Sequence, residues 1–392
     1  MNKEVQKSNN ILFDIAVVVV SIFSIFPIFQ ESALLRYLMP VFAIIILRHS
    51  SFVLRDSKEI RYFLYLSIVI LAFFVSFLLE SNLVPYFIHY GMLLIYIPIY
   101  LYYKKSGFDK AKRVVFILNI LFCISFYQTI QMLNIDAGFA RSASKNSEDG
   151  AGIDNMSGGY GIVYASLFFV FSNLYLLKSK LFTRLGQIVI IVSLLFGVYF
   201  IWRAGFFMAL MLLLFGFCIA LLKIKRKNVI PSLFFSLLIL LFLSVFKNEI
   251  VSATVPLVSG TKYEEKYIHI MSEEESPDGV FDTREERYVR DLGLILKYNF
   301  IGCWSRNMVG KHSFILDTLA QFGLILGGYF VWAMFFIPYR YFRQSQEKTF
   351  KYSITILLIL FIYLLFNSFV MSALPAIAVL LPYTHNLLSK SE

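Results

Sequence analysis

The sequence predicts an all-α polytopic membrane protein. Hydrophobic residues make up 58% of its 392 residues and charged residues only 16%, whereas a soluble domain carries about 25% charged residues. The apolar residues are also gathered into long runs, and most basic residues lie between those runs. The mean hydropathy of +0.71 therefore indicates helices that pack against one another in lipid rather than the core of a soluble protein.

The apolar runs have the length of membrane-spanning helices. Such a helix needs roughly 17–25 mostly apolar residues, and by that measure the chain holds about twelve. The runs cover residues 11–29, 33–47, 62–79, 83–103, 114–133, 159–177, 185–202, 205–222, 229–246, 313–337, 352–366 and 370–388. We expect an N-terminal bundle of about nine spans in residues 1–246 and about three C-terminal spans in residues 313–392.

The basic residues predict the orientation of these spans. The loops at residues 48–61, 104–113, 178–184, 223–227 and 340–351 hold three to five Lys or Arg residues each, and the loops between them are short, neutral or acidic. Because cytoplasmic loops carry the excess of Lys and Arg, both termini should lie in the cytoplasm. The net charge of +11 then reflects topology, and nucleic acid is not an expected partner.

Residues 247–312 form one large external loop, which is too long for an idle connection. Thr283 and Glu286 have the spacing of a capping box, so a helix should begin near Arg284. Its apolar residues recur at helical spacing, at Val289, Leu292, Ile295 and Leu296. We expect this apolar stripe to face the membrane or protein, while a basic stripe faces a cavity.

The basic stripe consists of Arg284, Arg287 and Arg290, which are spaced three residues apart. A guanidinium group binds phosphate through two parallel hydrogen bonds and stays charged at any working pH. Arg284 lies in the first helical turn, where free backbone N–H groups and the helix dipole favour an anion. The alternative is a solvated helix face, on which the three arginines pair with Glu285, Glu286 and Asp291.

Two further candidates lie near the outer membrane boundary. Arg203, in Trp202-Arg203-Ala204-Gly205, either faces an outer cavity or extends to the membrane surface as an isolated arginine. His312, a few residues after Trp304 and Arg306, begins a span and could transfer a proton near neutral pH, although a lone histidine is often structural. Asp317, one turn further, could orient His312 or accept a proton itself.

The sequence has no motif typical of a metal site or of nucleotide hydrolysis. The three cysteines, Cys123, Cys218 and Cys303, have neither metal-ligand spacing nor the pattern of a disulfide framework. No histidine forms a metal-ligand pattern, and the chain has no P-loop and no HExxH motif. We therefore expect no metal and no cofactor. Few charges lie within the spans, which argues against an ion-driven pump but leaves other transporters open.

The candidate residues resemble the motifs of the bacterial O-antigen ligase and polymerase (Wzy-type) superfamily. One family motif is His, then Asn, Ser or Gln, nine residues, Gly, two residues, and Gly, Thr or Tyr. His312-Ser313 and Gly323 are similar to it, but Leu326 stands at the last position, with Gly327 one residue later.

Two other family motifs have similar segments in this chain. The family's Arg before an Asn-Pro-Leu-x-Gly segment resembles Arg284 followed by Tyr298-Asn299-Phe300-Ile301-Gly302, with Asn in place of Pro. The family's Ser-Arg-small-small segment at the outer end of a span resembles Trp202-Arg203-Ala204-Gly205, without the Ser. The resemblance covers the topology and residues 202–328.

The resemblance implies a metal-independent glycosyltransferase of the membrane-embedded GT-C kind. Its donor and acceptor would be undecaprenyl-diphosphate-linked glycans at the outer face of the bacterial cytoplasmic membrane. Arg284 and Arg203 would bind the diphosphate, and Arg287 and Arg290 would be auxiliary phosphate or sugar contacts. His312 would position or deprotonate the acceptor hydroxyl. Further substrate-binding candidates are Asp317, Arg306 and Trp304.

The function expected from this resemblance is that of a polymerase that joins repeat units of exopolysaccharide, capsule or O-antigen. A chain-length regulator is then a candidate partner, along with membrane lipid. The nearest alternative is a ligase that transfers finished glycan to an acceptor such as lipid A core. The motifs do not separate the two, because both enzymes use the same donor. A flippase or transporter of lipid-linked sugars is the alternative from another class.

Overall fold

The computed structural model describes residues 3–54, 71, 74–75, 78–79, 90–106, 108–135, 159–178, 183–221, 252, 284–343, 345–368 and 370–391. Every regular element in these ranges is a helix. Most of the expected span at 62–79, all of that at 229–246, residues 83–89 of another, and nearly all of residues 247–283 in the expected external loop lie outside the described residues.

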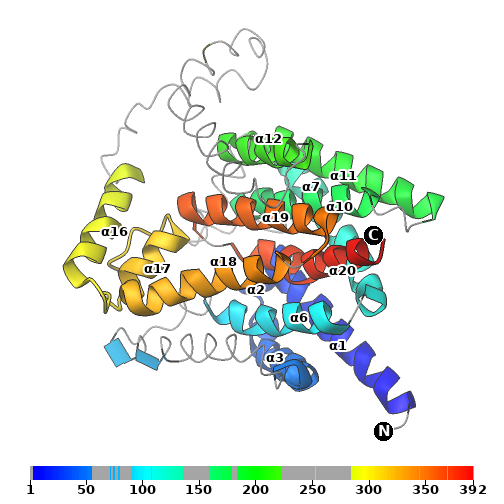
Figure 1. Ribbon diagram of the computed structural model, residues 1–392, viewed down its shortest axis with the longest axis horizontal. Coiled ribbons are helices and arrows are strands. Elements are labelled where there is room, and N and C mark those ends of the chain that lie inside the picture. The colour runs from blue at the N-terminus through cyan, green and yellow to red at the C-terminus, as the bar shows by residue number, and fades with distance from the viewer. Residues whose placement is uncertain are drawn as a thin grey trace.

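The helices run in chain order through two groups that the external loop separates (Figure 1). The first group is α1 (Lys3–Ile25), α2 (Pro27–Glu31), α3 (Ala33–Leu54), α6 (Met92–Ser106), α7 (Phe108–Ile135), α10 (Tyr160–Lys178), α11 (Arg184–Ala204) and α12 (Phe207–Leu221). The second is α16 (Arg284–Tyr298), α17 (Phe314–Phe322), η4 (Gly323–Gly327), α18 (Gly328–Phe342), α19 (Glu347–Phe366), η5 (Met371–Ala373), η6 (Ala376–Leu380) and α20 (Leu381–Ser391).

Six segments of the described part are long and apolar enough to cross a membrane. They are Ala111–Ile135, Tyr160–Lys178, Arg184–Ala204, Phe314–Arg340, Glu347–Phe366 and Met371–Ser389. Three shorter apolar helices, Ile11–Ile25, Tyr37–Ser51 and Met208–Ala220, accompany them. The all-helical membrane architecture is therefore confirmed, while a total of twelve spans stays a prediction.

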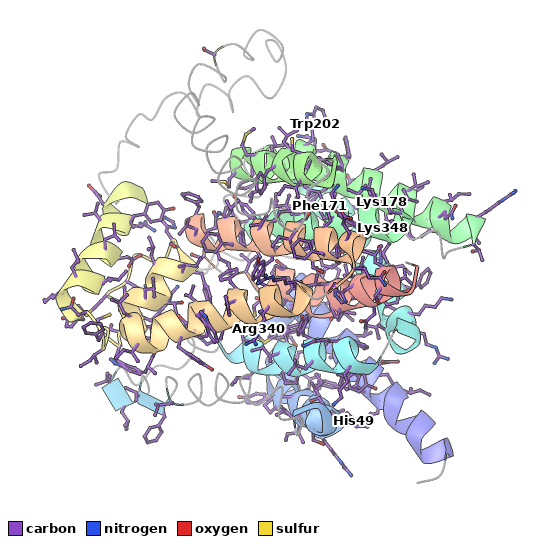
Figure 2. The ribbon with its side chains drawn as sticks, viewed as in Figure 1. His49, Phe171, Lys178, Trp202, Arg340 and Lys348 are labelled. Atoms are coloured by element: carbon purple, nitrogen blue, oxygen red, sulfur yellow. The ribbon has the colours of Figure 1, made fainter. Side chains whose placement is uncertain are left out.

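Helix α10 lies at the centre of the bundle, with most of its side chains buried. It packs against α11, α12, α19 and α20. Two glycines allow this close approach: a Cβ on Gly197 would stand 2.8 Å from Val170, and one on Gly216 would stand 2.1 Å from the ring of Phe171 (Figure 2). Because lipid supplies no hydrophobic driving force between helices, their association depends on close van der Waals packing, which small residues at such contacts make possible.

Buried hydroxyl groups connect the helices further. Ser172 of α10 and Tyr352 of α19 share a hydrogen bond of 3.0 Å, and Ser24 of α1 and Tyr96 of α6 share one of 2.8 Å. Hydrogen bonds between transmembrane helices stabilise a bundle by roughly 0.6 kcal/mol each.

The two ends of the bundle differ in what they carry. The chain termini lie at one end, and α16 and α17 lie at the other (Figure 1). Lys178 and Lys348 are on the side of the termini, away from α16 (Figure 2). This arrangement agrees with the predicted alternation of basic and non-basic loops; which side of a membrane each end faces stays a prediction.

Candidate functional site

The expected span at residues 313–337 is not one continuous helix. Helix α17 has only 9 residues and ends at Gly323, whose φ of 71° breaks the helical path. The π-helical turn η4 and α18 then supply 5 and 15 residues, about 30 Å at 1.5 Å per residue, which is enough to cross the hydrocarbon core. Helix α17 is therefore a separate element before the span.

Two glycines allow the preceding loop to pack closely against the backbone where α17 ends. A Cβ on Gly302 would stand 2.4 Å from the carbonyl oxygen of Gln321, and one on Gly323 would stand 2.2 Å from that of Phe300. Both have positive φ, 83° and 71°, which side chains other than glycine rarely adopt. Backbone bonds from Cys303 N to Ala320 O (3.0 Å) and from Trp304 N to Gln321 O (2.8 Å) complete the contact.

The residues at positions 299 and 327 have local structural reasons. Asn299 directly follows α16 with φ of 44°, a left-handed conformation that asparagine tolerates and that the fixed φ of proline excludes. Gly327 lies against α17, where a Cβ would stand 2.6 Å from the carbonyl oxygen of Thr318. The close approach thus requires glycine one residue after Leu326.

Helix α16 begins at Arg284, as the capping box predicted, and packs across α17. Its buried side chains are Asp291 and Leu294, and Leu294 packs with Val309 and Ala320. Three of the four residues of the expected apolar stripe, Val289, Leu292 and Leu296, are exposed and so do not pack on the protein; that they face the membrane stays a prediction. The inward face carries the carboxyl group of Asp291.

A buried polar cluster joins α16, the loop and α17. Arg306 Nη1 donates to Asp317 Oδ2 at 3.1 Å, and both side chains are at most 3% exposed. The backbone N–H of Lys311 donates to Asp317 Oδ1 at 2.9 Å, and that of Gly310 donates to Asp291 Oδ1 at 2.8 Å. The loop from Arg306 to Lys311 is therefore folded around two carboxyl groups, one from each helix.

The carboxyl group of Asp291 has fewer hydrogen-bond and charge partners than that of Asp317. Burial, reinforced by the negative charge of Asp317, raises the pKa of the Asp291 carboxyl from 3.8 to about 7; Gly310 N–H and Arg306 offset part of this rise. Its Oδ2 accepts no hydrogen bond from the protein. A proton on this oxygen would let Asp291 donate to Asp317, so two carboxyl groups and one arginine would carry no net charge.

Asp317, Arg306 and Trp304 support the site from within. The first two pair with each other and are enclosed, and Trp304 packs edge-on against Phe322, with ring centroids 5.3 Å apart. Asp317 and Arg306 are buried and Trp304 is half-buried; direct binding of substrate by these residues stays a prediction. The two oxygens of Asp317 accept from Arg306 and from the amide of Lys311, and an interaction of Asp317 with His312 stays a prediction.

Arg287 lies against the backbone at Gly310, two residues before His312 in the chain. The Cβ atom of Arg287 is 3.0 Å from the place a Cβ on Gly310 would occupy. His312, half-buried, follows two residues later, next to Ser313, which caps α17 by accepting a 3.1 Å bond from Leu316 N. Arg287 is also half-buried, and its Nε donates to no acceptor in the described part of the chain.

The other arginines have different surroundings. Arg290 is exposed whereas Arg287 is half-buried, so the two arginines differ in their access to solvent. The backbone of Arg284 begins α16, and its side chain lies outside the described residues. Arg203 is buried, and its Nη2 donates to Leu133 O (3.3 Å) and Asn134 Oδ1 (2.9 Å). A cation there stabilises the carbonyl end of α7, which gives Arg203 a structural role.

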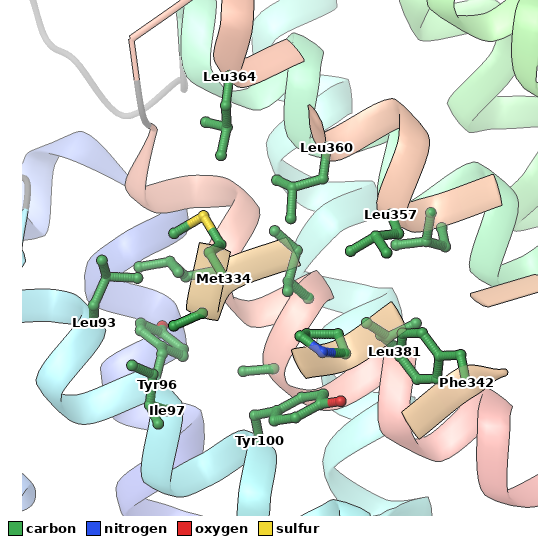
Figure 3. A pocket seen from close by; sticks show the side chains of 16 residues that line it. Leu93, Tyr96, Ile97, Tyr100, Met334, Phe342, Leu357, Leu360, Leu364 and Leu381 are labelled. Atoms are coloured by element: carbon green, nitrogen blue, oxygen red, sulfur yellow. The ribbon is translucent and has the colours of Figure 1, made fainter. Parts of the chain in front are cut away.

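An apolar pocket of about 130 Å³ lies between α6, α18, α19 and α20 (Figure 3). It begins near Leu364, whose carbonyl oxygen accepts a 3.5 Å hydrogen bond from Ser313, and reaches Phe342 toward the other end. The lining includes Tyr96 and Tyr100 but no charged side chain. Such a lining suits a hydrocarbon chain rather than a sugar.

No protein-family model and no curated protein matches this sequence. Among the residues that the structure describes, no group of three or more His, Cys, Asp or Glu side chains could hold a metal ion. Arg287, His312 and the buried polar cluster are the described groups that could carry the chemistry of the site.

Proposed function

We propose that the protein is a polysaccharide repeat-unit polymerase, a glycosyltransferase that joins undecaprenyl-diphosphate-linked oligosaccharides on the outer face of a bacterial cytoplasmic membrane. The observation that supports it most is Arg287. A half-buried guanidinium whose Nε has no acceptor among the residues that the structure describes suits a phosphate group, which can supply that acceptor and balance the charge. His312 follows two residues after Gly310, against which Arg287 lies, and just before α17.

The proposed reaction is one displacement at the anomeric carbon of the donor sugar. A hydroxyl oxygen of the acceptor glycan forms the new C–O bond, and the bond between that carbon and the diphosphate oxygen breaks. The lipid diphosphate leaves with the bonding electron pair. The hydroxyl proton passes to His312, or to the departing diphosphate if His312 only positions the acceptor.

The arginines would act on the leaving group. Arg287 would bind the diphosphate, with Arg284 one turn earlier on α16 and Arg290 as an auxiliary contact, and would stabilise the negative charge as it develops. The apolar pocket, which begins beneath Ser313, would accommodate part of the polyprenyl chain. Arg203 would maintain the end of α7 rather than bind the donor.

The experiment is the size profile of lipid-linked and surface glycan after deletion of the gene. Single repeats stranded on lipid at the outer face, with no long chains, are the expected result. Long lipid-linked chains that never reach a final acceptor would identify a ligase instead. Repeats confined to the cytoplasmic leaflet would identify a flippase and overturn the proposal.

Complementation with point variants tests the residues. Arg287→Lys should lose at least about tenfold of chain extension, because a point charge does not reproduce the planar guanidinium, and His312→Ala should abolish it. The matched control is Arg340→Lys, an exposed arginine in the last turn of α18, which should complement fully. Full activity of both site variants at normal protein level would remove Arg287 and His312 from the reaction.

A further inference from the structure

The outward side of α16 carries two distinct stripes. Val289, Leu292 and Leu296 are 66%, 49% and 74% exposed, and at 100° per residue they fall within one narrow sector of the helix. Glu286, Arg290 and Lys297 are exposed in the neighbouring sector. The helix is therefore amphipathic even on the side that the described residues leave uncovered.

The apolar stripe continues onto the start of the membrane span. Phe300 and Ile301, directly after α16, are 60% and 71% exposed. Leu324 N donates to Asn299 O at 3.1 Å and Ile325 N donates to Phe300 O at 3.4 Å, so these loop residues lie beside η4. Ile325 is itself 62% exposed. One apolar surface thus extends from α16 to the first turn of the segment that crosses the membrane.

The direction of α16 matches a position at a membrane surface. It lies across the end of the bundle, roughly perpendicular to α18 and α19 (Figure 1). If those helices cross the bilayer, α16 runs parallel to its surface. Since η4 and α18 together span about 30 Å, Leu324 and Ile325 fall at the boundary of the hydrocarbon core, beside Phe300 and Ile301.

We propose that the outward face of α16 is a membrane-interface anchor. Val289, Leu292 and Leu296, continued by Phe300 and Ile301, enter the boundary between headgroups and acyl chains. Arg290 and Lys297, in the neighbouring stripe, lie at the phosphate level, as basic residues beside an apolar face do in interfacial helices. A bilayer fits better than a soluble partner, because the apolar surface is continuous with a helix that is already in lipid.

The anchor has a consequence for the inward face. Asp291 and Leu294, which pack on α17, are on the opposite side of the same helix. Lipid contact on one side and the polar cluster on the other would hold α16 at a fixed depth. This inference concerns placement only, and it stands whether or not the protein transfers sugars.

The test uses an environment-sensitive fluorophore on single cysteines of the full chain in nanodiscs that hold one protein copy. Cys123, Cys218 and Cys303 are first replaced by serine, and cysteine is then placed at Leu292, at Leu296 or, as the matched control on the polar stripe, at Glu286. Doxyl-labelled phosphatidylglycerol in the nanodisc reports contact with lipid, and iodide reports contact with water.

We expect doxyl lipid to quench the Leu292→Cys and Leu296→Cys labels at least threefold more than the Glu286→Cys label, with iodide giving the reverse order. Equal iodide quenching at all three positions would place the apolar stripe in water and overturn the proposal. Shielding of Leu292→Cys and Leu296→Cys from both quenchers would also overturn it, since protein would then cover the stripe.

Discussion

Asp291 shows how one buried side chain can make this site sensitive to pH. Its carboxyl group is enclosed with Asp317, and Arg306 is the cation that pairs with Asp317. When Asp291 loses its proton, two negative charges face one guanidinium in a medium that screens them poorly. The charges that face Asp291 thus come from both elements packed against it, α17 and the loop.

The first prediction concerns stability against pH. The pKa of Asp291 is raised from 3.8 to about 7 on folding, so between these values the folded state binds the extra proton. The free energy of unfolding should therefore fall as pH rises from about 4 to about 7, on the order of 1 kcal/mol per pH unit, and then level off. Thermal unfolding of the purified protein in nanodiscs between pH 5 and 8 measures this slope.

Asp291→Asn is the matched variant for that slope. Its side-chain oxygen can accept from Gly310 N–H as Asp291 does, and its amide can donate to Asp317 as the protonated acid would. We expect the variant to unfold near the wild-type temperature at pH 5 and above it at pH 8. A variant with the wild-type slope would show that another group titrates.

At the scale of elements, the join between α16, the loop and α17 depends on glycine. Gly302 and Gly323 oppose each other with positive φ, and each would place a Cβ within 2.4 Å of backbone atoms on the other segment. Because the obstacles are backbone atoms, no side-chain rotation relieves them. The unit therefore tolerates no larger residue at either position.

The second prediction compares two glycines of the same unit. Gly302→Ala should loosen the loop, because the left-handed conformation alone costs roughly 1–2 kcal/mol and the overlap adds to it. Hydrogen exchange at residues 299–311 should rise, while that of α10 stays unchanged. Gly293→Ala is the control: nothing lies within 4 Å of its Cβ, and alanine favours the helix by roughly 0.5–1 kcal/mol. Equal exchange in both variants would contradict the role of Gly302.

At the scale of the whole molecule, the two ends of the bundle carry different residues. Lys178 and Lys348 lie toward the termini, and the site lies at the other end (Figure 2). The spacing of Lys and Arg predicts that the first end is cytoplasmic. The site would then face outward, where lipid-linked glycans are assembled in the proposed function.

The third prediction tests that orientation in cells. In a chain whose native cysteines are replaced, Asn307→Cys in the exposed part of the loop should react with a membrane-impermeant maleimide on intact cells. Lys348→Cys, exposed at the start of α19, should react only after permeabilisation. The reverse pattern would invert the topology and place the site in the cytoplasm.

Composition and spacing alone predicted the helical membrane bundle and the start of α16 at Arg284. They could do so because lipid imposes a minimum helix length and because capping depends on residues four or fewer apart. Both constraints are local, so neighbouring residues carry them. The alternation of basic loops predicts which end of the bundle is cytoplasmic, and that orientation stays a prediction.

Only the tertiary structure decided which side of α16 turns inward. Apolar spacing predicted that Val289, Leu292 and Leu296 face the membrane or the protein and did not decide between the two. The inward position belongs to Asp291, because Asp317 and Arg306 approach it from 15 or more residues further along the chain. The break at Gly323 and the contact of Arg203 with α7 were likewise decided by distant segments. Sequence patterns describe one helix at a time, and these features depend on what another part of the chain places opposite it.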